Sequence, residues 1–149
     1  MRSFSSVWEM DEYMIAAWNS VVKPQDHVYH LGDFCMKQQD VAIVKRLNGH
    51  KRLVRGNHDI FKTRTYMCHQ GFEEIYGVRV LADIIMSHIP LHPESIKACW
   101  LGNVHGHVHN NVPQGHFGPK YYNVSVEMLD YTPITLEEVK ARLKRQQML

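Results

Sequence analysis

The chain of 149 residues is 44% hydrophobic and 21% charged, which is typical of one soluble globular domain with a proper core. This composition excludes disordered and collagen-like proteins. The formal net charge is only +2, so the chain lacks the strongly basic surface that would indicate nucleic acid or an anionic membrane as its main partner.

The first half of the chain predicts helices that alternate with short strands. Ser6 and Glu9 form a capping box, and apolar residues at helical spacing follow them. Asp40 is placed to cap a further helix, which Asn48-Gly49 would end. In chain order we expect a helix over residues 7–21, a strand over 28–31, a helix over 40–47, a strand over 52–55 and a helix over 61–69.

Strands dominate the second half. We expect strands over residues 73–81, 84–87, 101–104 and 121–126, with a turn near Ala82-Asp83 between the first two. Thr135 and Glu138 form a second capping box that opens the C-terminal helix. This order predicts an α/β fold with stacked β-sheets flanked by helices. No repeat or linker divides the chain, so we expect one domain over residues 1–149.

Cysteine usage indicates a reducing compartment. The three cysteines, Cys35, Cys68 and Cys99, are far apart and form no Cys-x-x-Cys pair, which argues against disulfides and thiolate zinc sites. The sequence shows no signal-peptide pattern and no apolar run of membrane-spanning length. We therefore expect a cytoplasmic protein without a membrane partner.

Polar residues follow the ends of four predicted strands. They are Asp33, the run Asn57-His58-Asp59, His88, and the pair His107 and His109. Ligands of open α/β sheets bind at the carboxyl ends of the strands, so we expect these side chains to converge. Carboxylate, amide and imidazole ligands without thiolate suit manganese, iron or zinc in a reactive site.

The same residues carry a resemblance to a known family. Gly32-Asp33, Gly56-Asn57-His58-Asp59, Ser87-His88 and Gly106-His107-Val108-His109 occur in this order. They resemble motifs two to five of the calcineurin-like metallophosphoesterases. The resemblance implies an α/β/β/α sandwich, two divalent metal ions (manganese, iron or zinc) and hydrolysis of phosphate esters by a metal-bound hydroxide. Nucleic acid would then be involved only as a substrate.

The resemblance also implies a role for each residue. Asp33 would bridge two metal ions, with Asn57, His88 and His107 completing one ion's ligands and His109 binding the other. Three neighbours of Asn57 would take part in the reaction. His58 would protonate the leaving alkoxide, Asp59 would orient His58, and Arg55 would contact substrate phosphate.

One family motif is missing. The family begins with Asp-x-His on a central strand, and this chain has no Asp-x-His before Asp33. We therefore expect an N-terminally incomplete domain without its first central strand, because the start is shortened or misassigned or because another chain supplies that strand. Only Asp33 and His109 would hold the second metal, so we expect one bound ion and weak or no activity.

The remaining histidines have other interpretations. We expect His30 to be a buried, hydrogen-bonded core residue, His105 to support the ligands at most, and His92 to lie in a loop with substrate contact as an alternative. Two other functions stay open. The chain could be a catalytically inactive metal-binding relic, or a nucleic-acid-binding module that uses its basic C-terminal helix, which the low net charge disfavours.

Overall fold

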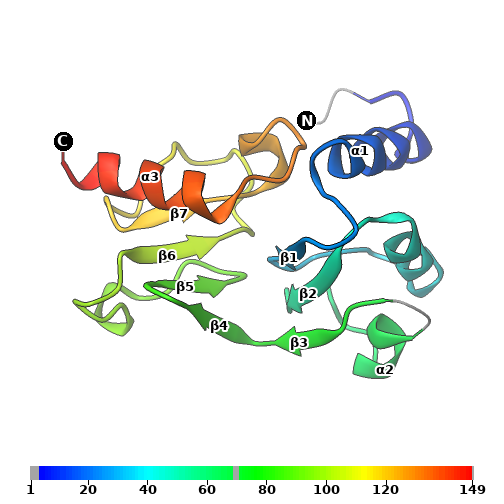
Figure 1. Ribbon diagram of the computed structural model, residues 1–149, viewed down its shortest axis with the longest axis horizontal. Coiled ribbons are helices and arrows are strands. Elements are labelled where there is room, and N and C mark those ends of the chain that lie inside the picture. Colours follow the sequence, from blue (N-terminus) through cyan, green and yellow to red (C-terminus); the bar gives the residue numbers. More distant parts are fainter. Residues whose placement is uncertain (1–3, 69–70, 149) are drawn as a thin grey trace.

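The computed structural model describes residues 4–68 and 71–148, which form two β-sheets flanked by helices (Figure 1). The first sheet has the order β1-β2-β3, with β1 at His27–His30, β2 at His50–Val54 and β3 at Glu74–Tyr76. All its neighbouring strands are parallel. The predicted α/β class with helices flanking two sheets is thereby confirmed.

The second sheet has the order β4-β5-β6-β7. Its strands are β4 at Val78–Leu81, β5 at Ile84–Ser87, β6 at Gly102–His105 and β7 at Tyr121–Asn123. β4 is antiparallel to β5, and β5, β6 and β7 are mutually parallel. The register aligns Ser87 with His105 and His105 with Asn123, so the carboxyl ends of the three parallel strands form one edge.

In the described part of the chain, three α-helices and three 3-10 helices connect and cover the strands. They are α1 at Val7–Val21, η1 at Gln38–Arg46, α2 at Thr63–Met67, η2 at Pro93–Ser95, η3 at Val126–Met128 and α3 at Leu136–Gln147. None of the described helices is long and apolar enough to cross a membrane.

Both predicted capping boxes are half formed. The Ser6 hydroxyl accepts from the Glu9 amide at 3.1 Å, and the Thr135 hydroxyl accepts from the Glu138 amide at 3.2 Å. The Glu9 carboxylate accepts from the Ser5 amide at 2.6 Å instead of the Ser6 amide. Each hydroxyl therefore caps its helix as predicted, and both helices begin where the sequence indicated.

Two apolar clusters position the strand ends. One joins Val54 of β2 to β5, β6, β7 and α3 and contains Ile84, Met86, Val104, Tyr122, Val139 and Leu143. The other packs Leu53 against η1, α2 and the chain after α2, through Val41, Val44, Tyr66 and Phe72. Leu53 and Val54 are adjacent in β2 and face different clusters, because successive side chains of a strand point to opposite faces. β2 is therefore packed on both sides.

Three predicted elements need correction. The single strand over 73–81 breaks at Gly77, with β3 in the first sheet and β4 in the second. The helix expected from Asp40 is the 3-10 helix η1, which begins at Gln38 after Lys37 without a side-chain cap. The strand over 121–126 ends at Asn123, because the Asn123 side chain accepts from the Ser125 amide at 2.9 Å and turns the chain.

The other boundaries shift by small amounts. β1 and β2 each begin and end one or two residues before the predicted bounds, and β6 begins and ends one residue later. The helix predicted over 61–69 is α2, and its predicted end at His69 lies outside the described residues.

Candidate metal centre

The carboxyl ends of β1 in the first sheet and β5 in the second sheet meet at His88. This residue follows β5 and is buried, with a side chain 6% exposed. Its ring Nδ1 lies 2.7 Å from the carbonyl oxygen of Leu31, the residue that follows β1. A carbonyl only accepts hydrogen bonds, so Nδ1 carries the proton and donates it. In the neutral ring Nε2 is then an unprotonated nitrogen with a free lone pair.

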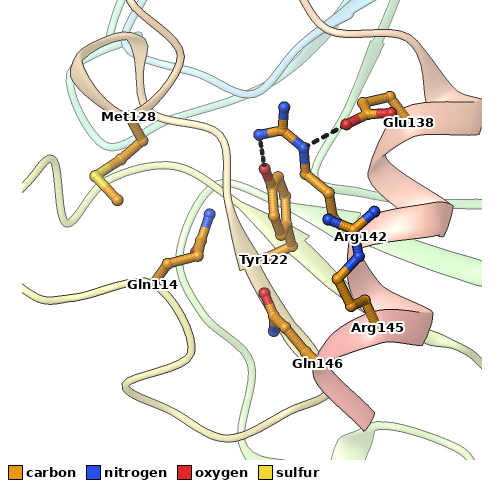
Figure 2. A pocket seen from close by; sticks show the side chains of 7 residues that line it. All are labelled: Gln114, Tyr122, Met128, Glu138, Arg142, Arg145 and Gln146. Atoms are coloured by element: carbon orange, nitrogen blue, oxygen red, sulfur yellow. Dashed lines mark hydrogen bonds and ion pairs between the residues drawn. The ribbon is translucent and has the colours of Figure 1, made fainter. Parts of the chain in front are cut away.

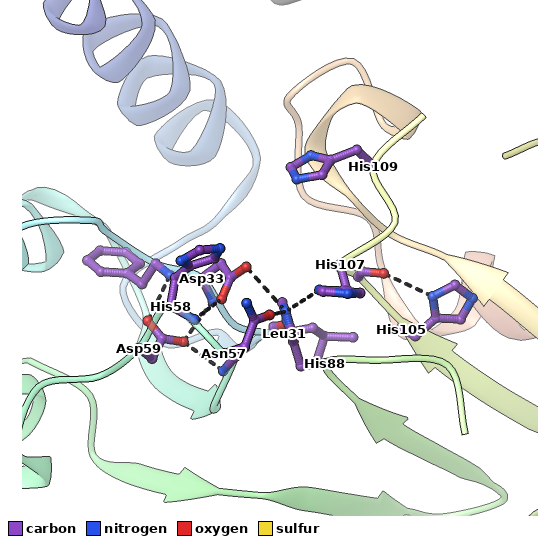
Figure 3. A network of polar contacts seen from close by, with 12 residues as sticks. Leu31, Asp33, Asn57, His58, Asp59, His88, His105, His107 and His109 are labelled. Atoms are coloured by element: carbon purple, nitrogen blue, oxygen red, sulfur yellow. Dashed lines mark hydrogen bonds and ion pairs between the residues drawn. The ribbon is translucent and has the colours of Figure 1, made fainter. Parts of the chain in front are cut away.

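Three further ligand atoms surround this Nε2 (Figure 3). Asn57 Oδ1 lies 3.0 Å away, His107 Nδ1 lies 3.1 Å away and Asp33 Oδ2 lies 3.2 Å away. The ligand atoms of Asp33, His88 and His107 all lie within 4.8 Å of one another. The structure therefore brings together the four residues that the sequence predicted as ligands of one metal ion.

The donor set of this cluster fits a divalent cation. A carboxylate oxygen, an amide oxygen and an imidazole nitrogen all face His88 Nε2, and each of these atoms can offer a lone pair to a cation. Lone pairs at these distances repel one another unless a proton or a cation lies among them. Oxygen and imidazole donors in this number suit manganese, iron or zinc.

Asp59 binds backbone groups through its carboxylate. Its carboxylate is buried and accepts three backbone amides, from Asp33 at 2.7 Å, Phe34 at 2.9 Å and Gly56 at 2.8 Å. None of the hydrogen bonds found for its carboxylate goes to the His58 ring. The carboxylate therefore ties the loop after β1 to the loop after β2, which carry two of the four cluster residues.

Arg55 braces the same loop from within. Its Nε donates to the Asp59 carbonyl at 2.8 Å, a second guanidinium nitrogen donates to the Phe61 carbonyl, and the guanidinium carbon lies 5.6 Å from the centre of the Tyr66 ring. These contacts hold the turn that contains His58 and Asp59. The predicted contact of Arg55 with substrate phosphate stays a prediction.

His58 lies beside the cluster with an exposed side chain. Its backbone amide donates to Asp33 Oδ1 at 2.9 Å, so the same carboxylate that faces His88 also positions His58. The His58 ring is therefore held next to the cluster without serving as one of its four ligand groups. This placement suits a group that exchanges protons with a substrate.

His109 is the predicted ligand that stands apart. Within the described residues, the group of three metal-ligand side chains does not include it. Figure 3 shows His109 away from the cluster and beyond His107. Its ring Nδ1 instead faces Glu127 of η3, at 3.0 Å from Oε1 and 3.2 Å from Oε2. Sequence reasoning did not identify Glu127 as a partner of His109. Its position soon after β7, as an acidic residue near a strand end, was a usable signal.

The other histidines follow their predictions in part. His105 is 1% exposed, lies edge-on to Phe117 and Tyr121, and has its pKa lowered by burial. The pKa of His30 is also lowered by burial, but its Nδ1 lacks the hydrogen bond that we expected. His92 lies in the expected loop, where it caps η2.

Two motif glycines let the loops approach each other. A Cβ on Gly56 would lie 2.5 Å from the Asp33 amide nitrogen, and a Cβ on Gly32 would lie 2.6 Å from the Gly56 nitrogen. Gly32 also has a left-handed φ of 95°. Real Cβ atoms do not approach backbone this closely. The Gly-Asp and Gly-Asn-His-Asp patterns thus have a steric reason beside their chemical one.

We expect Gly56→Ala to separate the two loops and destabilise the protein by about 1–3 kcal/mol, the usual effect of overpacking. Affinity for Mn²⁺ should fall with stability, because Asp33 and Asn57 would no longer converge. Gly77→Ala is the matched control, since a Cβ there has no atom within 4 Å. Urea denaturation and calorimetric Mn²⁺ titration measure both effects; equal behaviour of the two variants would contradict the steric interpretation.

A separate concavity lies between β7 and α3 (Figure 2). Arg142 stands at its wall, where it donates to Glu138 at 2.7 Å and to the Tyr122 hydroxyl at 2.7 Å. Its lining contains none of the motif residues and consists of Gln114, Tyr122, Met128, Glu138, Arg142, Arg145 and Gln146. The candidate metal ligands therefore lie outside this pocket.

Comparisons with known proteins identify two similar chains. No family model matches the sequence. The chain is 32% identical over 145 residues to the uncharacterized protein MJ1445 of Methanocaldococcus jannaschii, and the alignment covers 91% of this chain and 76% of that protein. It also resembles the crystal structure of the protein of unknown function AQ665 from Aquifex aeolicus. That match has 28% identity and a TM-score of 0.71, and covers 93% of this chain and 86% of the other.

Proposed function

The chain belongs to the same family as MJ1445 of Methanocaldococcus jannaschii, and we propose that it is a metal-dependent phosphoesterase of the calcineurin-like type. The observation that carries this proposal is the convergence of Asp33, Asn57 and His107 on Nε2 of His88. The order of the motifs that supply these residues resembles that family. The two-sheet arrangement is consistent with its sandwich fold.

The cluster residues would hold one divalent cation, and Asp33 would extend to a second. When bound, such ions lower the pKa of a water molecule and neutralise charge on phosphoryl oxygens. The residues around them do the rest. His88 is fixed by the Leu31 carbonyl, and Asp59 and Arg55 keep the loops closed. His58 would donate a proton to the leaving alkoxide.

The exposed side of the site indicates a substrate that docks from solvent. His58 and His107 are both exposed, whereas His88 and Asp59 behind them are buried. Among the four ligand groups only Asp33 carries a negative charge, because the others are imidazoles and an amide, and this suits an anionic phosphate ester. Both phosphate monoesters and phosphate diesters satisfy this description. The cytoplasmic location of the protein stays a prediction.

A metal-binding protein without hydrolytic activity is the second candidate. The placement of His109 favours it, because this residue contacts Glu127 and lies outside the three-member ligand group. Four ligand groups would then hold one ion, and only Asp33 and His109 would be left for a second. Binding of Mn²⁺ without turnover of any phosphate ester would support this candidate.

We expect the purified chain to bind Mn²⁺ and to hydrolyse p-nitrophenyl phosphate or its bis-ester weakly, in a manner that EDTA abolishes and added metal restores. Loss of a residue that only contacts a metal ligand lowers metal affinity by about 10–100-fold. His107→Asn removes a ligand itself, so it should weaken metal binding by more than that. Asparagine tolerates the left-handed φ of 66° at this position, so the backbone is preserved. His116→Asn, at an exposed histidine outside the motifs, is the control. Unchanged metal affinity in His107→Asn would overturn the proposed site.

A further inference from the structure

His109 is held at both its backbone and its ring by the segment that follows β7. Its carbonyl accepts from Asn123 Nδ2 at 2.6 Å, and its φ is 51°, in the left-handed region. Asn123 is 2% exposed. A residue held this firmly at an unusual φ has a fixed direction, although its side chain is 48% exposed.

Glu127 fixes the ring. Both its carboxylate oxygens lie near His109 Nδ1, at 3.0 Å and 3.2 Å, and its side chain is only 12% exposed. η3, the single helical turn over Val126–Met128 that carries Glu127, is closed by hydrogen bonds from the Met128 amide to Ser125 and from the Tyr131 amide to Val126. The carboxylate is therefore presented from an ordered turn.

The chemistry of the pair determines the tautomer. An ionised carboxylate can only accept hydrogen bonds, so Nδ1 of His109 must carry the proton. In the neutral ring Nε2 then keeps its lone pair and points away from Glu127. Histidines that bind metals commonly donate their other ring N–H to a carboxylate in this way, which fixes the ring and makes it a better ligand.

We propose that Glu127 is a positioning residue, which holds His109 in the Nδ1–H tautomer so that Nε2 can bind the second cation of the site. This inference rests on the proposed function, because it assumes a second cation near Asp33. It gives a role to a side chain outside all four motifs.

The tautomer can be read directly in the metal-free protein. Long-range ¹⁵N–¹H correlation spectra of the imidazole rings should show His109 in the Nδ1–H form. Glu127→Ala removes the acceptor, so the ring should move toward the Nε2–H form that free histidine prefers. Glu127→Gln keeps an acceptor oxygen and should retain the Nδ1–H form in large part. Glu137→Ala, an exposed acid on α3, should change nothing.

Metal titration of the same variants completes the test. Glu127→Ala should weaken the second Mn²⁺ equivalent by about 10–100-fold and leave the first unchanged, with Glu127→Gln in between. An unchanged tautomer, or unchanged affinity for the second ion, in Glu127→Ala would overturn the inference, and so would binding of only one Mn²⁺ by the wild-type protein. If both change as expected but the wild-type protein hydrolyses no phosphate ester, the inference stands and the proposed hydrolysis fails.

Discussion

Replacing Asp59 with alanine should lower the free energy of unfolding by about 3 kcal/mol or more, because each buried amide left without its acceptor costs about 1–3 kcal/mol. Three amides lose their acceptor at once, those of Asp33, Phe34 and Gly56. The two loops that these amides belong to should then separate. Metal affinity should fall together with stability, although Asp59 is not one of the converging ligand atoms.

A graded series makes this expectation testable even if the alanine variant fails to fold. Asp59→Asn retains one acceptor oxygen and should lose about 1–3 kcal/mol, the effect of one unpaired amide. Asp130→Asn is the control, because Asp130 is exposed and its φ of 49° is one that asparagine tolerates. Urea unfolding and Mn²⁺ calorimetry give the two readouts. Wild-type stability in Asp59→Asn would contradict the role assigned to this carboxylate.

The convergence of the ligands could be predicted because it depends on strand ends. Asp33, Asn57, His88 and His107 each follow a strand that the sequence pattern located to within about two residues. Parallel strands that share a register bring such residues to one edge, and chain order alone is enough to expect this. The steric need for Gly32 and Gly56 could not be read in the same way, since it arises from an approach between two loops.

The division of residues 73–81 could not be predicted for a related reason. Alternating side chains indicate a strand but do not say which neighbour it pairs with. β3 pairs with β2, whereas β4 pairs with β5 in the other sheet, and the break at Gly77 separates them. The length of the apolar pattern suggested one strand because each half is too short to carry a signal of its own.

The backbone contacts of Asp59 and Arg55 could not be predicted, because a motif gives residue types but not the direction of side chains. Both residues lie at the predicted place, next to the ligands, and both turn toward backbone groups. Closing two loops around one ion brings their amides and carbonyls together, and these groups need partners. Charged side chains within a motif can therefore be occupied by its backbone. The contact of His109 with Glu127 was missed because the partners belong to different segments, 18 residues apart.

His58→Ala should lower kcat by about 10²–10⁴-fold, the range that a positioned general acid contributes, while metal content stays close to that of the wild type. The reason is geometric: the His58 backbone is bound to Asp33, but its ring is not among the four converging ligand groups. The loss should be large for alkyl phosphates and small for p-nitrophenyl esters, whose leaving group needs little protonation. His58→Gln, which keeps polarity without an acid of suitable strength, should resemble alanine. Equal losses for both leaving groups, or loss of metal from His58→Ala, would show that His58 acts as a ligand or holds the loop, and not as the proton donor.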